Sequence, residues 1–148
     1  MKALTLQQPC ATLVATGAKR IETRSWATRH RGPLAIHAGL GLPSRTRLAC
    51  GRAPLRELLE AAGAFPPEGL PRGAVLAVAE LAGCVPMGPG GSVPGEPDPG
   101  PDDPERFFGD YRPGRFAWLL RDVCVLADPV PARGALGLWE WQPSPAGA

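Results

Sequence analysis

Side chains able to bind or react are concentrated in the first quarter of this 148-residue chain. Six of them fall within nineteen positions: Lys19, Glu22, Arg24, Trp26, Arg31 and His37. A lysine and a carboxylate can perform acid–base chemistry when burial lowers the pKa of the lysine and the carboxylate orients a water molecule. Guanidinium groups suit bidentate phosphate contacts, and an indole can stack on a base. These residue types fit a ligand that carries a base and a phosphate.

A short strand and a short helix come before these residues. Residues 2–6 form a β-prone run, and Pro9 suits the first turn of a helix, where its missing N–H costs nothing. Gly17 suits the left-handed position just past the end of that helix. The side-chain amide of Gln8 could read a base edge, although capping is the commoner role at a helix start. Lys19 could likewise act as a cap, because the helix dipole favours a cation there.

Residues 21–26 predict a strand that carries three of the candidate side chains. Because side chains alternate between the two faces of a strand, Glu22, Arg24 and Trp26 share one face. An acid, a guanidinium and an indole on one face are unusual for a protein core. An edge strand with a solvated charged face, covered by the tryptophan, explains the same pattern without a ligand.

Residues 32–38 repeat the alternating pattern. Leu34 and Ile36 are expected to face the core, whereas His37 lies on the opposite face. A lone histidine is more often structural than functional, so His37 is the weakest of the candidates. The predicted core of the whole chain comprises Leu34, Ile36, Val75, Ala77, Phe116 and Trp118.

The rest of the chain adds one helix, two strands and a loop. Residues 55–62 are amphipathic and predict a surface helix, and residues 115–127 predict the longest strand. Residues 74–85 predict an apolar strand, in which Glu80 is either an edge-strand residue that faces water or a cleft residue with a partner, and we favour the first. Residues 86–104 form a Pro/Gly-rich tract that predicts a flexible loop, because it cannot bury enough surface to become ordered.

The composition is that of a single globular domain. The chain is long enough for one core and short for two, and its hydrophobic content is 44%. No run of about eighteen apolar residues and no apolar signal region occurs, so we expect no membrane span. We expect a cytoplasmic protein and favour a monomer. The first sixty residues carry a net charge of +7 and the remainder −5, so the positive charge coincides with the candidate residues.

The four cysteines are widely spaced and include no CxxC pair. They are Cys10, Cys50, Cys84 and Cys124. Because a four-cysteine zinc site normally uses close pairs, we expect no metal and no cofactor. The cysteines are interpreted as buried, reduced thiols.

Three motifs resemble the ASCH domain family, a branch of the PUA-like β-barrels. Residues 8–26 read Q-P-x-A-x-x-x-x-x-G-x-K-x-I-E-x-R-x-W, and residues 31–38 read R-G-P-L-x-I-H-A. Residues 134–140, G-A-L-G-L-W-E, are similar to that family's closing strand. The resemblance implies an α+β, mainly β fold: one small PUA-like β-barrel over residues 1–148, with a few short peripheral helices. It also implies that the matching residues line a cleft.

The resemblance further implies binding of RNA or of a nucleoside or nucleotide in that basic cleft. The residues expected to bind are Gln8, Arg24, Trp26, Arg31, His37 and Trp139. Trp26 and Trp139 would stack on a base in that cleft, and the alternatives are core aromatic residues or a surface cation–π pair with an arginine. Trp118 and Trp141 are assigned to packing.

Two other functions remain open. The acetylcytidine amidohydrolases, a similar branch, use a lysine at the position of Lys19, a threonine three residues later and a glutamate from a separate segment. Here Glu22 occupies the threonine position, and the separate glutamate cannot be placed, with Glu80 and Glu105 as candidates. Lys19 and Glu22 are the candidate catalytic pair for a hydrolase acting on a modified nucleoside, or for a ribonuclease. A protein-interaction module that uses the same cleft is the third possibility.

Overall fold

The computed structural model describes residues 1–96 and 103–143. Its main elements are β1 (Lys2–Leu6), α1 (Cys10–Ala15), β2 (Ile21–Arg24), β3 (Gly32–Ala38), α2 (Ser44–Cys50), α3 (Leu55–Ala61), β4 (Ala74–Pro86), β5 (Phe116–Pro131) and β6 (Leu138–Glu140). Short 3-10 helices occur at Pro67–Gly69, Pro89–Gly91 and Pro104–Phe108. The strands form one mixed sheet in the order β2-β5-β4-β3-β1-β6, in which only the β1–β3 pair is parallel among the described strands.

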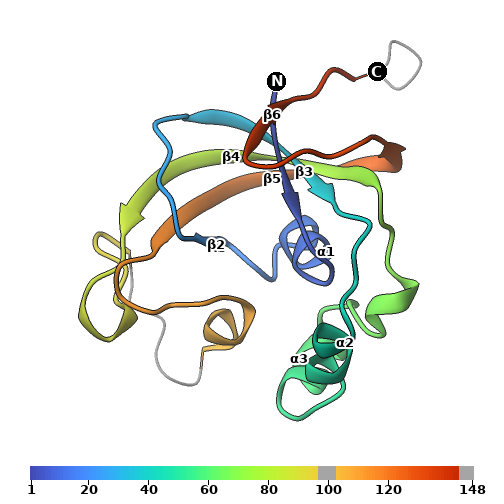
Figure 1. Cartoon of the computed structure of the whole chain (residues 1–148), viewed down its shortest axis with the longest axis horizontal. Helices are drawn as coiled ribbons and strands as arrows, with labels where there is room; N and C mark the ends of the chain where they lie inside the picture. The colour runs from blue at the N-terminus through green and yellow to red at the C-terminus, as the bar shows by residue number, and fades with distance from the viewer. Residues whose placement is uncertain (97–102, 144–148) are drawn as a thin grey trace.

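The sheet is curved into a half-barrel, and α1 lies within the curve (Figure 1). With 13 and 16 residues, β4 and β5 are much longer than the other strands, and their pairing shifts register at three places. Such irregularities bend strands and increase their twist. The two long strands therefore carry the curvature. The predicted α+β, mainly β, barrel-like fold is confirmed.

Most of the predicted core residues are fully buried. Leu34, Ile36, Val75, Ala77 and Trp118 are each 0% exposed. The remaining member of the predicted core, Phe116, is partly buried against the same cluster. The predicted core residues do not form one cluster: Leu34, Ile36 and Trp118 belong to the main core, whereas Val75 packs with Trp141 in a separate cluster.

Glu80 lies in the middle of the sheet. Its strand, β4, pairs with β3 on one side and β5 on the other, and Glu80 lies opposite Pro33 and Arg121. The interpretation of Glu80 as an edge-strand residue is therefore wrong. The error has a physical cause, because strand order depends on long-range pairing that side-chain alternation does not encode.

Part of the Pro/Gly-rich tract is packed rather than solvated. Met87 and Val93 are 5% and 3% exposed, and they contact Ile21 and Tyr111 in a small cluster of their own. The expectation that this tract buries little surface is wrong for these two residues, because tertiary contacts supply an apolar surface that the local sequence does not reveal. Residues 97–102 of the tract lie outside the described residues.

The cysteines occupy different environments. Cys50 is buried, Cys10 and Cys84 are partly buried, and all four thiols are free. Cys124 is exposed, so the expectation of buried thiols is wrong for this residue. It lies in the second half of β5, which is largely exposed.

The helices are short and peripheral apart from α1. α1 has 6 residues, and α2 and α3 have 7 each. Within the described ranges, no helix is both long and apolar enough to cross a membrane. α2 and α3 contact each other beside the open end of the half-barrel (Figure 1).

Candidate functional site

Lys19 lies fully buried between α1 and β2. Just past the end of α1, Gly17 has a left-handed φ of 83°. The backbone N–H of Lys19 then donates to the carbonyl of Leu13 in the last turn of that helix. The side chain is 0% exposed, and Nζ donates to the carbonyls of Ile21 at 2.6 Å and Phe108 at 2.5 Å. Nζ is therefore occupied by the protein itself.

Glu22 lies between two cations. One carboxylate oxygen is 3.7 Å from Lys19 Nζ, and the other is 3.3 Å from Arg24 Nη2. Glu22 also accepts a hydrogen bond from the backbone N–H of Thr23 at 2.8 Å, and it is only 7% exposed. A buried carboxylate is stable only with such partners, so Lys19, Glu22 and Arg24 act as one unit.

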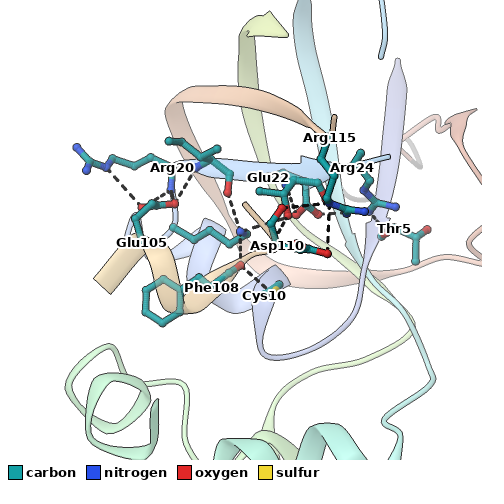
Figure 2. Close-up of polar contacts among 12 residues, drawn as sticks. Thr5, Cys10, Arg20, Glu22, Arg24, Glu105, Phe108, Asp110 and Arg115 are labelled. Carbon is teal, nitrogen blue, oxygen red and sulfur yellow. Dashed lines mark hydrogen bonds and ion pairs between the residues drawn. The ribbon is translucent and has the colours of Figure 1, made fainter. Parts of the chain in front are cut away.

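Arg24 connects the two sides of the curved sheet. It lies on β2, at one edge, and its Nη2 donates to the carbonyl of Thr5 at 2.9 Å (Figure 2). Thr5 lies on β1, next to the opposite edge strand β6. The guanidinium therefore bridges the opening of the half-barrel.

A segment from Glu105 to Asp110, here called the strap, covers this unit. Glu105 accepts from the backbone N–H groups of Arg20 and Ile21, each at 2.9 Å. Further along, Phe108 accepts from Lys19, and the N–H of Asp110 donates to a side chain of β2 (Figure 2). The strap therefore satisfies polar groups on β2 and seals Lys19 from solvent.

Glu105 was one of two candidates for the separate glutamate of a hydrolase. It is 2% exposed, and both carboxylate oxygens are within hydrogen-bond distance of the Arg20 N–H. Burial raises its pKa, while the hydrogen bond from Ile21 and the charge of Lys19 oppose that shift. The carboxylate is therefore committed to holding the strap on β2.

A pocket of about 600 Å³ lies between the strap and the three helices. We call it the helical pocket. α1, α2 and α3 contribute most of its walls, and the strap contributes Phe107 and Phe108. Its polar residues are Gln7, Arg45, Thr46 and Asp110. The pocket is thus largely apolar with a few polar groups, as is usual for a small-molecule site.

Two groups that border the helical pocket have shifted pKa values. Burial raises the pKa of the Cys10 thiol to about 11, so the thiol remains protonated at neutral pH and is a poor nucleophile. The hydrogen-bonded Arg112 guanidinium holds the pKa of Asp110 at about 2, so this carboxylate stays charged. This charge is balanced, because Asp110 forms ion pairs with Arg112 and Arg115.

His37 and Trp139 form a second group around Thr5. His37 is 2% exposed, and its Nε2 lies 2.8 Å from the carbonyl of Ala132. Because a carbonyl can only accept, Nε2 carries the hydrogen, and Nδ1 accepts from the Thr5 hydroxyl at 3.1 Å. Trp139 Nε1 donates to the same hydroxyl oxygen at 3.1 Å, with its ring edge-on to His37. Thr5 therefore contacts both this group and Arg24.

Three predicted binding residues lie apart from these groups. Gln8 is 0% exposed and holds the start of α1 through Thr12, which matches the capping alternative. Trp26 packs edge-on against Trp118 at a ring distance of 4.7 Å. Arg31 is exposed, and its guanidinium donates to nearby carbonyls of the β2–β3 loop.

Sequence reasoning missed the helical pocket and the role of Thr5. Arg45 and Phe107, which line that pocket, come from segments far apart in the chain. Only the strap had a local signal: Asp103 caps its 3-10 helix by accepting from the N–H of Glu105. Within the described ranges, no three His, Cys, Asp or Glu side chains gather closely enough to share a metal ion.

Comparison with known proteins agrees with this architecture. The ASCH domain model matches residues 4–93, and the chain therefore belongs to the ASCH domain family, a family of PUA-like domains. The chain is similar to Activating signal cointegrator 1 of Homo sapiens and of Mus musculus, with 38% identity to each over 82 residues. That match covers 55% of this chain and 14% of the length of each relative.

Removing the Glu105 carboxylate should destabilise the strap. We expect Glu105→Ala to lower the free energy of unfolding by about 1–3 kcal/mol, because it leaves the N–H groups of Arg20 and Ile21 without their acceptor. Glu105→Gln keeps an acceptor oxygen and should lose much less. Urea unfolding of both variants measures the difference, and an equal loss in the two would contradict this role.

The same carboxylate should make stability depend on pH. Its folded-state pKa lies above the ordinary value of 4.5 because of burial, so the part of the stability that is linked to its proton is fully present below that pH and is lost as pH rises through the raised pKa. Glu105→Gln, which does not titrate, should lack this component. Comparing both proteins at about pH 4 and about pH 7 isolates it.

Proposed function

We propose that this ASCH domain binds single-stranded RNA or a nucleotide in the helical pocket. The observation that carries the proposal is a pocket of about 600 Å³ in a domain whose PUA-like family suggests RNA binding in general. This volume falls within the range of about 300–1,000 Å³ that is usual for small-molecule sites.

The residues at the pocket suit the parts of a nucleotide. Phe107 is 43% exposed, so its ring is available to stack on a base. Arg45 is exposed on α2 and suits a phosphate. The amide of Gln7 can accept a hydrogen bond from a base edge and can also donate one, whereas both carboxylate oxygens of Asp110 already accept from Arg112.

Lys19, Glu22 and Arg24 support the pocket from behind. Phe108 lines the pocket and accepts from Lys19, so the buried unit fixes the position of that wall. Lys19 Nζ has two carbonyl partners and a carboxylate, which favours a positioning role over attack on a substrate. The contacts of Lys19 therefore support binding ahead of hydrolysis.

A salt titration tests the proposal with a matched pair of arginines. Arg45 and Arg47 lie on the same short helix and are both exposed, but only Arg45 lines the pocket. We expect Arg45→Ala to weaken RNA binding and to lower the slope of log Kobs against log salt by about 0.7, the contribution of one phosphate contact to a single strand. Arg47→Ala should leave both nearly unchanged. Fluorescence anisotropy with a labelled oligonucleotide measures both quantities.

The same preparation distinguishes the alternatives. Incubation with acetylated and unmodified cytidine, followed by chromatography, would reveal deacetylation if the domain is a hydrolase. RNA binding that responds equally to Arg45→Ala and Arg47→Ala would move the site away from the helical pocket. Absence of both binding and turnover would leave a protein-interaction module as the better account.

A further inference from the structure

A second pocket lies at the end of β1, beside the His37–Trp139 group. It has a volume of about 410 Å³, and its lining includes Thr5, His37, Leu40, Arg133, Gly134 and Leu136. We call it the strand-end pocket. The function proposed for the helical pocket does not use these residues.

The strand-end pocket is positively charged. Arg133 lines it and is exposed. A second guanidinium lies at its rim, because Arg72 Nη1 donates to the carbonyl of Leu40 at 3.0 Å. Among its described lining residues there is no Asp or Glu. The pocket therefore favours an anionic ligand.

Its apolar residues are unusually exposed. Leu40 is 76% exposed and Leu136 is 99% exposed, and both line the pocket. The flat apolar face of a base can cover exposed leucine side chains of this kind. Two cations beside two exposed leucines match a phosphate joined to a base.

The floor of the strand-end pocket is rigid. A Cβ on Gly134 would lie 2.7 Å from both His37 Cε1 and Thr5 Oγ1, so the backbone packs directly on this hydrogen-bonded pair. The nitrogens of His37 are both used, by Thr5 and Ala132. These contacts place His37 beneath the pocket as a support rather than as a free acid or base.

One lining residue of each pocket lies at the end of β1. Thr5 lines the strand-end pocket and Gln7 lines the helical pocket, two residues further on and about 7 Å along an extended chain. The N–H of Gly39 donates to the carbonyl of Leu6 at 2.9 Å, which holds the chain after β3 against the end of β1. From there the chain leads to α2 (Figure 1). Arg45 follows on that helix.

We propose that the strand-end pocket is a second nucleotide subsite, so that one RNA strand occupies both pockets. This inference rests on the proposed function of the helical pocket. It specifies the ligand as an oligonucleotide: a mononucleotide fills the helical pocket alone, and the next nucleotides place a phosphate near Arg133 and Arg72 and a base against Leu40 and Leu136.

The test compares an oligonucleotide with a mononucleotide. Calorimetry with adenosine monophosphate and with an oligoadenylate is carried out on the wild type, Arg133→Ala and the control Arg29→Ala, which removes an exposed arginine of the β2–β3 loop. We expect Arg133→Ala to weaken oligoadenylate binding and lower its salt slope by about 0.7, while binding of the monophosphate is unchanged. Arg29→Ala should change neither.

Each other outcome overturns the inference. Equal affinity of the wild type for both ligands, or equal effects of Arg133→Ala and Arg29→Ala, removes the second subsite. If the monophosphate still binds and responds to Arg45→Ala, the proposed function stands while this inference falls. If neither ligand binds the folded wild type, both fall. Leu136→Ser, a fully exposed position, provides a second variant that should lose affinity for the oligonucleotide without unfolding.

Discussion

Replacing Lys19 with methionine should lower the free energy of unfolding by about 3–5 kcal/mol, the usual cost of removing one partner of a buried ion pair. Methionine fills a similar volume but provides no donor. Glu22, at 7% exposure, would lose its nearest buried cation, and the carbonyls of Ile21 and Phe108 would lose their ammonium. Urea denaturation followed by circular dichroism measures the loss.

The other lysine of the chain provides a matched control. Lys2 is paired with Glu140 at 2.8 Å, but both side chains are substantially exposed. Lys2→Met should therefore cost only about 0–1 kcal/mol. Equal losses for the two variants would show that Lys19 is solvated in solution. Adding Glu22→Gln to Lys19→Met should recover part of the stability, because it removes the carboxylate that the first substitution left without Lys19.

Substitution of Lys19 removes the hydrogen bond that holds Phe108, a wall of the helical pocket. A loss of RNA binding or of turnover in Lys19→Ala follows from a collapsed pocket wall as readily as from a lost catalytic group. Only affinity measured under conditions in which the variant is still folded separates the two. Arg45→Ala avoids the difficulty because Arg45 is exposed.

Trp118→Ala should have an effect of similar size, about 3–5 kcal/mol of folding stability, because truncation of a buried aromatic side chain leaves a cavity. Trp118 is 0% exposed in the main core cluster. Its Nε1 donates to the carbonyl of Trp26 at 3.2 Å, and the two rings meet edge-on at 4.7 Å. Thermal and chemical unfolding should agree on the loss.

Conservative replacement provides the comparison for Trp118. Trp118→Phe retains most of the apolar volume and loses only the hydrogen bond and part of the ring, so it should cost clearly less than Trp118→Ala. Similar losses in the two would indicate that the hydrogen bond to Trp26, rather than packing, dominates. Because Trp26 packs on the same ring, substitution of Trp26 should also lower folding stability. Any change in ligand affinity should follow from that loss.

Local sequence determined the elements and the facing of their side chains. Residues 32–38 alternate regularly, and this placed Leu34 and Ile36 in the core, where each is 0% exposed. Pro9 and Gly17 bracketed α1 because each is favoured by the backbone geometry of a helix end. The three motifs were sufficient to indicate the family, and the family model confirms it over residues 4–93.

Alternation also placed Glu22 and Arg24 on one face of β2, and the structure pairs them at 3.3 Å. What alternation could not supply was the environment of that face. The strap covers it with Glu105 and Phe108, which lie more than eighty residues further along the chain. Such contacts depend on the closure of a long loop, which leaves no periodic signal in the sequence.

Only the tertiary structure decided which candidates meet. The candidates His37 and Trp139 meet at Thr5 because β1 pairs in parallel with β3 and antiparallel with β6, a pairing between distant segments. The pairing of β4 with β3 and β5 placed Glu80 within the sheet, and Trp26 packs against Trp118 of β5. Sequence fixes local geometry through backbone sterics and side-chain periodicity, whereas strand order and pocket walls follow from packing of the whole chain, where many weak contacts act together.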